Sequence, residues 1–371
     1  MGNSRKVTWI ELFFDLVFVG AAHKLAIVMK DQDTLLGVLP YMLLFLPIIW
    51  TWVGHTIFST QFESKSWVYH MLTLGQMVAV LGMVIQIDGA YGPHMVGFAW
   101  CYAAARALLI LMYVGGFFRS PMKFFSVLPM VIGYGASAVL WAVSPLTPSP
   151  IVLWILAFSI DFLTPILTKT RATSMHMHST HFPERLGLLT VIMLGEIIIS
   201  LVASMHLLGL TRTSFYILAG GVLTIIMVYW SYFQFIQKSI IGFESSKSRI
   251  FLYSHIPLFL GLISIASGFK GLIEQKSTEP LIILGIVIFT LSFRALKYVR
   301  DRRVLKRQVI MLLVLIPFLV VYPYFASDVL TNVAVITSFF VLYLFITEII
   351  LTPYKDRLDL DQAGDRLSWE D

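Results

Sequence analysis

The sequence predicts an all-α polytopic membrane protein with about twelve transmembrane helices. Hydrophobic residues make up 58% of the 371-residue chain, whereas soluble domains are about 45–50% apolar. The mean hydropathy is +0.82, and apolar runs of about 20 residues, the length that crosses a bilayer as a helix, follow one another along the chain. A soluble fold cannot bury this much apolar surface. Residues 1–371 are therefore expected to form a single integral membrane domain.

Twelve apolar runs mark the expected spans in chain order. The first six cover residues 9–29, 36–57, 67–87, 94–114, 124–143 and 151–168, and the last six cover 184–204, 214–235, 251–269, 281–298, 309–325 and 329–351. The polar end of the chain, 354–371, contains too few apolar residues to fold alone. It is predicted to be a short cytoplasmic tail.

The basic residues between the runs indicate the orientation of the chain. Lys297–Arg307 contains six basic residues, whereas Gly89–Pro93 and Ser144–Pro150 contain none. Because cytoplasmic loops are enriched in Lys and Arg, both termini are expected on the cytoplasmic side of the cell (inner) membrane. This topology accounts for the net charge of +6, so the lipid bilayer is the expected partner and nucleic acid is not. Trp50 and Trp52 are expected in an aromatic belt at the membrane interface.

Several scarce residues recur at an offset of 188 positions, the spacing from Arg106 to Arg294. The other matches are Gly97 with Gly285 and Pro129 with Pro317, and Asp161 falls one residue out of register with Glu348. Arg and Pro are uncommon in membrane helices, so these matches favour a parallel duplication of six helices, with halves 1–170 and 171–353. Coincidence in a mostly apolar alphabet is the alternative.

Ionisable residues inside the apolar runs are the candidate site, because a charge at the centre of a bilayer costs about 2.5–3.5 kcal/mol. Glu11 and Asp15 lie one helical turn apart in the first run. Arg185 and Glu196, eleven residues apart, lie within about 20° of one helix face and are interpreted as an ion pair. The remaining candidates for substrate or ion binding or coupling are Arg106, Asp161, His181, Glu184 and Arg294.

The expected orientation gathers these charges in the cytoplasmic half of the membrane. A polar pocket that opens to the cytoplasm would hydrate them. Separate buried ion pairs without a cavity are the alternative. Three histidines ahead of the seventh run, His176, His178 and His181, could bind Zn or Cu, but a fourth ligand is not evident, and loop histidines are common. No cofactor is therefore expected.

Two motifs resemble those of the bacterial low-temperature-requirement protein A (LtrA) family. They are Glu11-Leu-Phe-Phe-Asp15-Leu-Val-Phe in the first run, and His181-x-x-Glu184-Arg185 followed by Leu194-Gly195-Glu196 in the seventh. The resemblance covers nearly the whole chain in its layout of spans. It implies a polytopic inner-membrane protein named for a growth phenotype, and it supplies no molecular activity. The His-rich loop is not part of the family pattern, so the resemblance does not support a metal site.

Three functions remain open from the sequence. The first is a transporter or channel-like permease for an ion or small solute, in which the carboxylates bind protons or cations and the arginines are their partners or bind anions. The second is an intramembrane enzyme that acts on a lipid-linked substrate, with His181 and Glu184 as base and orienting group; it requires a groove open to lipid. The third is a structural stress-adaptation protein whose charges only hold helices together. Parallel halves and charges near the membrane midplane favour the first.

Overall fold

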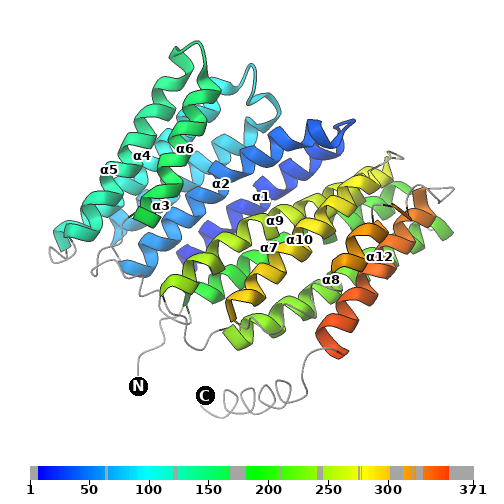
Figure 1. Cartoon of the computed structure of the whole chain (residues 1–371). Coiled ribbons are helices and arrows are strands. Elements are labelled where there is room, and N and C mark those ends of the chain that lie inside the picture. The colour runs from blue at the N-terminus through cyan, green and yellow to red at the C-terminus, as the bar shows by residue number, and fades with distance from the viewer. Residues whose placement is uncertain are drawn as a thin grey trace. The chain divides into compact units, whose positions relative to one another are not determined.

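The computed structural model contains helices and no strand over the residues it describes (Figure 1). These residues are 7–62, 66–119, 124–167, 181–208, 211–239, 245–274, 276, 278–300, 312–319, 321–322 and 329–350. Within this part of the chain, 11 helices are long and apolar enough to cross a membrane. The predicted class, an all-α polytopic membrane protein, is therefore confirmed.

The spans lie close to their predicted positions. In chain order the described α-helices are α1 (Trp9–Lys30), α2 (Leu35–Gln61), α3 (Trp67–Ile85), α4 (Met95–Arg119), α5 (Phe124–Val143), α6 (Pro150–Leu167), α7 (His181–Leu208), α8 (Arg212–Ser239), α9 (Ser245–Ile273), α10 (Glu279–Arg300) and α12 (Val329–Phe345). Short 3₁₀ turns, η1 (Ile87–Gly89) and η3 (Ser144–Leu146), follow α3 and α5, and the π-helix η6 (Ile346–Ile350) continues α12. The predicted run 309–325 is described as a helix only over 312–319, and the predicted tail lies outside the described residues.

Local side-chain signals set the starts of the first two helices. At α1, Glu11 Oε2 accepts hydrogen bonds of 2.8 Å from both the backbone N–H and the hydroxyl of Thr8, which forms a capping box. At α2, the Thr34 hydroxyl accepts from the N–H of Gly37 at 3.1 Å. Glu11 therefore has a structural role at the start of α1 besides any functional one.

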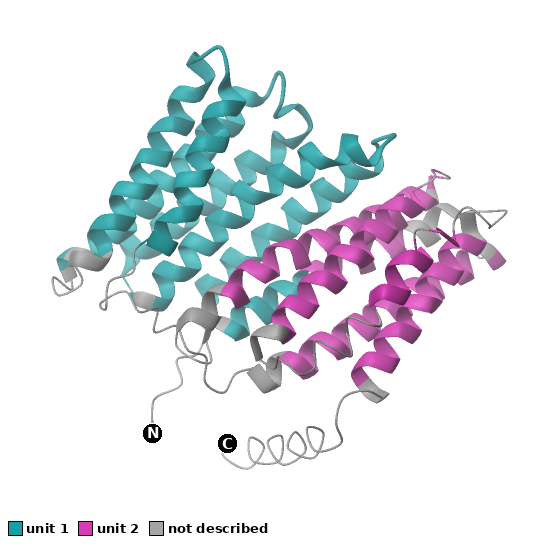
Figure 2. Cartoon of the chain, viewed as in Figure 1, with its two compact units in different colours: residues 1–192, 244–248 teal, residues 193–243, 249–371 magenta. Residues whose placement is uncertain are grey.

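The chain divides into two compact units (Figure 2). Unit 1 comprises residues 1–192 and 244–248, and unit 2 comprises 193–243 and 249–371. In unit 1, α4 packs between α3 and α5, α6 packs on α5, and α1 contacts α2 and α3. In unit 2, α12 packs on α8 and α10. The boundary between the two units falls within α7, and the two predicted halves and the internal duplication stay predictions.

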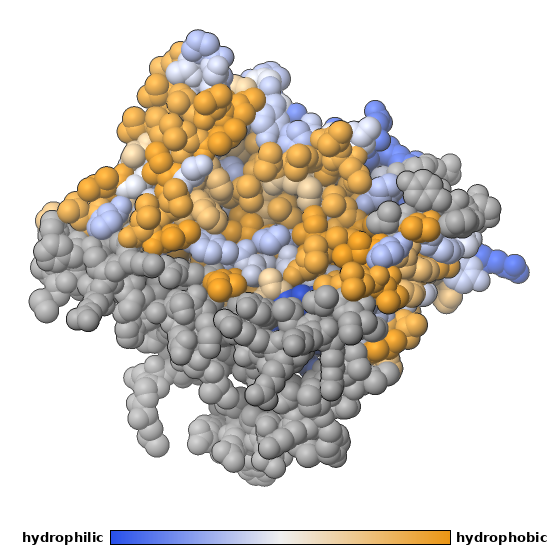
Figure 3. All heavy atoms as spheres, in the orientation of Figure 1, coloured by the Kyte–Doolittle hydropathy of each residue, from blue (hydrophilic) through white to orange (hydrophobic). Residues whose placement is uncertain are grey.

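The helices expose apolar side chains on their outer surfaces. In the view of Figure 3, apolar residues cover α5 and α6, whereas the connection at the tip of these helices is hydrophilic. The exposed residues on these two helices include Ile132, Val139, Val152 and Leu156. This distribution is what helices in contact with lipid require, because their backbone polar groups are satisfied internally and only side chains meet the hydrocarbon.

A pair of glycines brings α9 and α10 together in unit 2. A Cβ atom added to Gly261 of α9 would lie 2.7 Å from the backbone nitrogen of Phe289 and 2.9 Å from the carbonyl oxygen of Gly285. Both contacts are backbone atoms of α10, so neither can move without shifting that helix. Small residues permit this close approach between membrane helices.

We expect Gly261→Ala to lower the free energy of unfolding by roughly 1–3 kcal/mol through overpacking at this crossing. The matched control is Gly20→Ala in α1, because a Cβ added there meets nothing within 4 Å. The control should be neutral or slightly stabilising, since Ala favours a helix over Gly by about 1 kcal/mol. Thermal unfolding in detergent measures both. Equal melting temperatures for the two variants would contradict the described contact.

Candidate functional site

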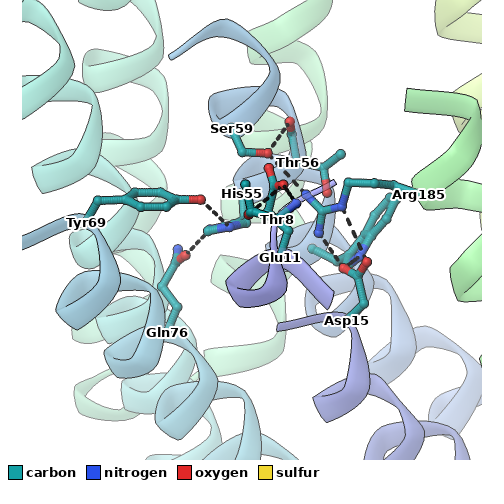
Figure 4. A network of polar contacts seen from close by, with 10 residues as sticks. Thr8, Glu11, Asp15, His55, Thr56, Ser59, Tyr69, Gln76 and Arg185 are labelled. Atoms are coloured by element: carbon teal, nitrogen blue, oxygen red, sulfur yellow. Dashed lines mark hydrogen bonds and ion pairs between the residues drawn. The ribbon is translucent and has the colours of Figure 1, made fainter. Parts of the chain in front are cut away.

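The charged residues at the centre of unit 1 form a network between α1, α2 and the first turns of α7 (Figure 4). Asp15 of α1 and Arg185 of α7 form an ion pair, in which Arg185 Nη2 donates to Asp15 Oδ1 and Arg185 Nε lies 3.4 Å from Asp15 Oδ2. The exposed fractions of the two residues are 1% and 0%. A pair held out of water in this way depends on good geometry and on further hydrogen bonds to its remaining atoms.

Helix α2 supplies neutral hydrogen-bond partners to both charges. Trp52 Nε1 donates to Asp15 Oδ1 at 2.6 Å, and Arg185 Nη1 donates to Ser59 Oγ at 3.1 Å. The guanidinium carbon of Arg185 also lies 5.3 Å from the centre of the Trp52 ring. Each member of the ion pair therefore has a second partner that carries no charge.

The expected aromatic belt at Trp50 and Trp52 is wrong, because both side chains are fully buried. The Trp52 indole N–H binds the buried carboxylate of Asp15. The Trp50 ring packs on Phe162 of α6, with 5.2 Å between ring centres. In these positions the aromatic residues fill the interior of unit 1, and they do not mark a membrane surface.

His55 extends the network from α2 to α3 and α4. Its Nδ1 lies 2.9 Å from Gln76 Oε1 and its Nε2 lies 3.4 Å from the Tyr69 hydroxyl. Its ring stacks on Phe14 of α1 with 4.1 Å between ring centres, and Gln76 Nε2 donates to the carbonyl of Ala105 in α4 at 3.0 Å. Sequence reasoning missed Gln76 and Tyr69, although their spacing of seven residues places them on one face of a helix.

Not all residues of the two sequence motifs lie in this network. Glu11 is buried beside Asp15 and Arg185, within the same network (Figure 4). Glu184 lies on the exposed side of α7. His181 begins α7, but its side chain lies outside what the structure describes. The three residues that come together are therefore Glu11, Asp15 and Arg185.

A second buried network in unit 1 joins α4 to α6. Arg106 Nε donates to Asp161 Oδ2 at 3.0 Å and lies 2.9 Å from the Tyr102 hydroxyl, which also donates to Asp161 Oδ2. All three residues are fully buried. The guanidinium lies 5.2 Å from the centre of the Tyr134 ring and against the backbone of Gly54, where a Cβ would lie 2.9 Å from Arg106 Nη1. This arginine is enclosed by aromatic rings and by a glycine of α2.

Two buried acids of unit 2, Glu196 and Glu348, pair with lysines and an arginine. Lys270 of α9 donates to Glu196 Oε1 of α7 at 2.9 Å. Glu348, in the π-helix η6, binds both Arg294 at 3.1 Å and Lys297. Sequence reasoning missed the two lysines, because each lies at the end of an apolar run, where a loop charge is expected.

The expected ion pair between Arg185 and Glu196 is not formed. Arg185 binds Asp15, and Glu196 binds Lys270. Eleven residues of α-helix separate the two positions by about 16 Å along the axis, which is too far for a direct contact. A shared helix face therefore predicted the direction of the two side chains but not their partners.

The two units contain similar contacts. An Arg–carboxylate pair joins α4 to α6 in unit 1 and α10 to the π-helix η6 in unit 2, and a His–Tyr contact joins α2 to α3 and α8 to α9. An ion pair also joins the first helix of each unit to its third helix or to the turn that follows it. The contacts are Arg106–Asp161 and Arg294–Glu348, His55–Tyr69 and Tyr232–His255, and Lys24–Asp88 and Glu196–Lys270.

The described residues contain no group of three or more His, Cys, Asp or Glu side chains placed to hold a metal ion. His176 and His178 lie outside the described part of the chain, as does the side chain of His181. The weak metal hypothesis for these three histidines therefore stays a hypothesis.

Comparison with known proteins identifies the family of this chain. The sequence model described as "Bacterial low temperature requirement A protein (LtrA)" matches residues 6–342. The chain belongs to the LtrA family. The resemblance predicted from the motifs around Asp15 and Arg185 is thus confirmed. A relative of this LtrA protein in Rhizobium meliloti (strain 1021), described as "Uncharacterized protein RA0937", is 25% identical over 284 residues, which are 72% of this chain and 69% of the relative. No solved structure matches the chain significantly.

We expect Asp15→Leu to lower the free energy of unfolding by about 3–5 kcal/mol, because it leaves the Arg185 guanidinium buried without its counter-ion. The double variant Asp15→Leu/Arg185→Met should recover most of this loss, since two apolar residues have no charge to desolvate. Unfolding in detergent, followed by circular dichroism, measures the difference.

The matched control is Glu274→Leu, which breaks the ion pair with Lys276, whose members have side chains 40% and 41% exposed. Its loss should be less than about 1 kcal/mol. If the single and double variants at the buried pair were equally unstable, the ion pair would not be the interaction that holds α1 to α7.

Proposed function

We propose that this LtrA protein is a transporter or channel-like permease that moves an ion or a small solute across the cell membrane. The observation that carries the proposal is the Asp15–Arg185 ion pair, which is buried between membrane-spanning helices of unit 1. A helical bundle does not need such a pair for stability, because apolar residues of similar volume are often at least as stable. Charges retained inside membranes characteristically mark the paths of ions and substrates.

The neutral partners of this pair allow it to open at a moderate cost. When a proton or another cation binds Asp15, its attraction to Arg185 weakens. Arg185 then keeps its hydrogen bond to Ser59, and Asp15 keeps the one from Trp52. Each group keeps one hydrogen bond, which lowers the cost of opening the pair, while the Arg185 charge loses its counter-ion and favours a different arrangement. Binding of the coupling ion can thus shift the balance between two arrangements of α1 and α7.

The predicted duplication into two parallel halves also supports transport. The similar contacts within the two units fit the duplication that the offset between Arg106 and Arg294 predicts. Parallel repeats are a common architecture of membrane transporters. We infer that the Arg106–Asp161 and Arg294–Glu348 pairs stiffen the two halves. The Asp15–Arg185 network is the part that responds to ions.

The distribution of basic residues supports an inner-membrane protein with cytoplasmic termini. In that orientation the first turns of α1 and α7 lie on the cytoplasmic side. Asp15 is six residues beyond the start of α1 at Trp9, and Arg185 is four beyond the start of α7 at His181. These spacings correspond to about 9 Å and 6 Å of helix. The network is therefore within a short distance of the cytoplasm, and we propose that the substrate enters from there.

The enzyme hypothesis has weaker support. A groove open to lipid does exist beside α2, but its lining residues on that helix end at Pro47. Twelve residues of helix, about 18 Å, separate Pro47 from Ser59, which binds Arg185 at the start of α7. The groove is therefore remote from His181 and Glu184, the proposed base and orienting group.

The transport proposal is tested by measuring ion flux and the change of internal pH in proteoliposomes, with and without a membrane potential. We expect Asp15→Asn and Glu196→Gln each to reduce flux by about tenfold or more, equivalent to about 1.4 kcal/mol in the barrier. The matched control is Glu274→Gln, because the ion pair of Glu274 with Lys276 is exposed, with side-chain fractions of 40% and 41%. This control should leave flux unchanged.

The two alternatives give different outcomes in the same assay. Unchanged flux in the stable double variant Asp15→Leu/Arg185→Met would mean that the charges only hold helices together. The absence of wild-type flux under every gradient would contradict ion transport. Analysis of cellular lipids would then be the next test, because it addresses the enzyme hypothesis.

A further inference from the structure

A groove of about 750 Å³ runs between the first half of α2 and the first half of α6 in unit 1. Its walls are formed by Leu36–Pro47 of α2 and by one face of Ile151–Ser159 of α6. Both helices are membrane spans, and the lining side chains of Leu39, Leu43 and Ile155 are at least half exposed. The groove therefore opens onto the hydrocarbon region of the membrane. It is lined by none of the charged residues of the candidate site.

The dimensions of the groove indicate what can fill it. The α2 wall from Leu36 to Pro47 is twelve residues long, or about 18 Å. That length is close to the hydrocarbon thickness of one leaflet, about 15 Å. An alkyl chain of a bilayer lipid that lies along α2 therefore matches the groove in length.

Three polar side chains of the groove lie toward one end. Gln32 and Tyr91 lie where α1 connects to α2 and α3 connects to α4, and Tyr41 lies about two turns into α2. The hydroxyl of Ser159, farther along α6, donates to the carbonyl of Ile155 at 2.7 Å. The Tyr91 hydroxyl donates to the carbonyl of Pro40 at 2.7 Å. Burial and the neighbouring Tyr41 phenol raise the pKa of Tyr91 to about 12, so this hydroxyl stays neutral at physiological pH. The groove thus has an apolar body and an uncharged polar rim, the pattern of an amphipathic lipid at the membrane interface.

We propose that this groove binds the alkyl chains of a membrane phospholipid, with the headgroup at the Tyr41–Tyr91 rim. Because the bilayer is as apolar as the groove, retention arises from packing contacts and rim hydrogen bonds, and not from the hydrophobic effect. Trp141 and Trp154 line the groove with their rings stacked 4.7 Å apart. Trp141 in turn lies 4.6 Å from the ring of Tyr102, which binds the Arg106–Asp161 pair. The lipid is therefore a structural neighbour of that buried pair.

Ser159→Phe tests the proposal, because Ser159 lines the groove and a phenyl ring there would occupy part of it. The matched control is Leu156→Phe, which is half exposed on the same helix but outside the groove. Protein purified in detergent is analysed by native mass spectrometry for retained phospholipid. We expect the wild type and the control to retain one phospholipid. Ser159→Phe should retain at least about fivefold less phospholipid, equivalent to about 1 kcal/mol. Equal retention in both variants would overturn the proposal.

A second measurement uses the wild-type protein and does not depend on the folding of Ser159→Phe. The protein is placed in bilayers whose phospholipid carries bromine on its alkyl chains, and is then diluted into unbrominated lipid. Quenching of Trp154 fluorescence is obtained as the difference between the wild type and Trp154→Phe. A lipid held in the groove leaves this quenching in place after dilution. Immediate recovery of the fluorescence would show ordinary lipid exchange and would overturn the proposal.

Discussion

A charge inside the membrane must have a partner, and this requirement determines how the helices of unit 1 meet. Asp15 is buried in α1 because Arg185 from α7 and Trp52 from α2 both reach its carboxylate. Arg185 is buried because its guanidinium also donates to the Ser59 hydroxyl and packs against the Trp52 ring. One carboxylate thus joins the consecutive helices α1 and α2 to α7, which is distant in sequence. Apolar packing alone would leave their rotation about their axes less specified, since most residues on these helices are interchangeable in lipid or in the core.

The same requirement holds in unit 2. Glu348 is buried in the π-helix η6, and Arg294 and Lys297 of α10 both bind its carboxylate. Single-turn π-helices are frequent at functional sites, and this one holds a buried charge beside its two partners.

The sequence predicted which charges are buried better than it predicted their partners. Length and hydropathy gave the described spans, because a bilayer imposes its thickness on every helix. Glu11, Asp15 and Arg185 could be found because charges are expensive in an apolar run. Their neutral partners could not, since Trp52 and Ser59 are common in such runs. Pairing also depends on which helices are neighbours, and this arises from tertiary packing that no periodicity within one helix contains.

The most direct test of this account is whether water reaches the Asp15–Arg185 network from the cytoplasm during function. Cys101 is the single cysteine of the chain, so Cys101→Ser provides a background for Ser59→Cys, beside Arg185. Labelling by a membrane-impermeant maleimide is measured from each side of oriented vesicles, with and without an ion gradient. A transporter predicts labelling from the cytoplasmic side that changes with the gradient. The absence of labelling from both sides under every gradient would contradict the account and leave the ion pair as a static lock.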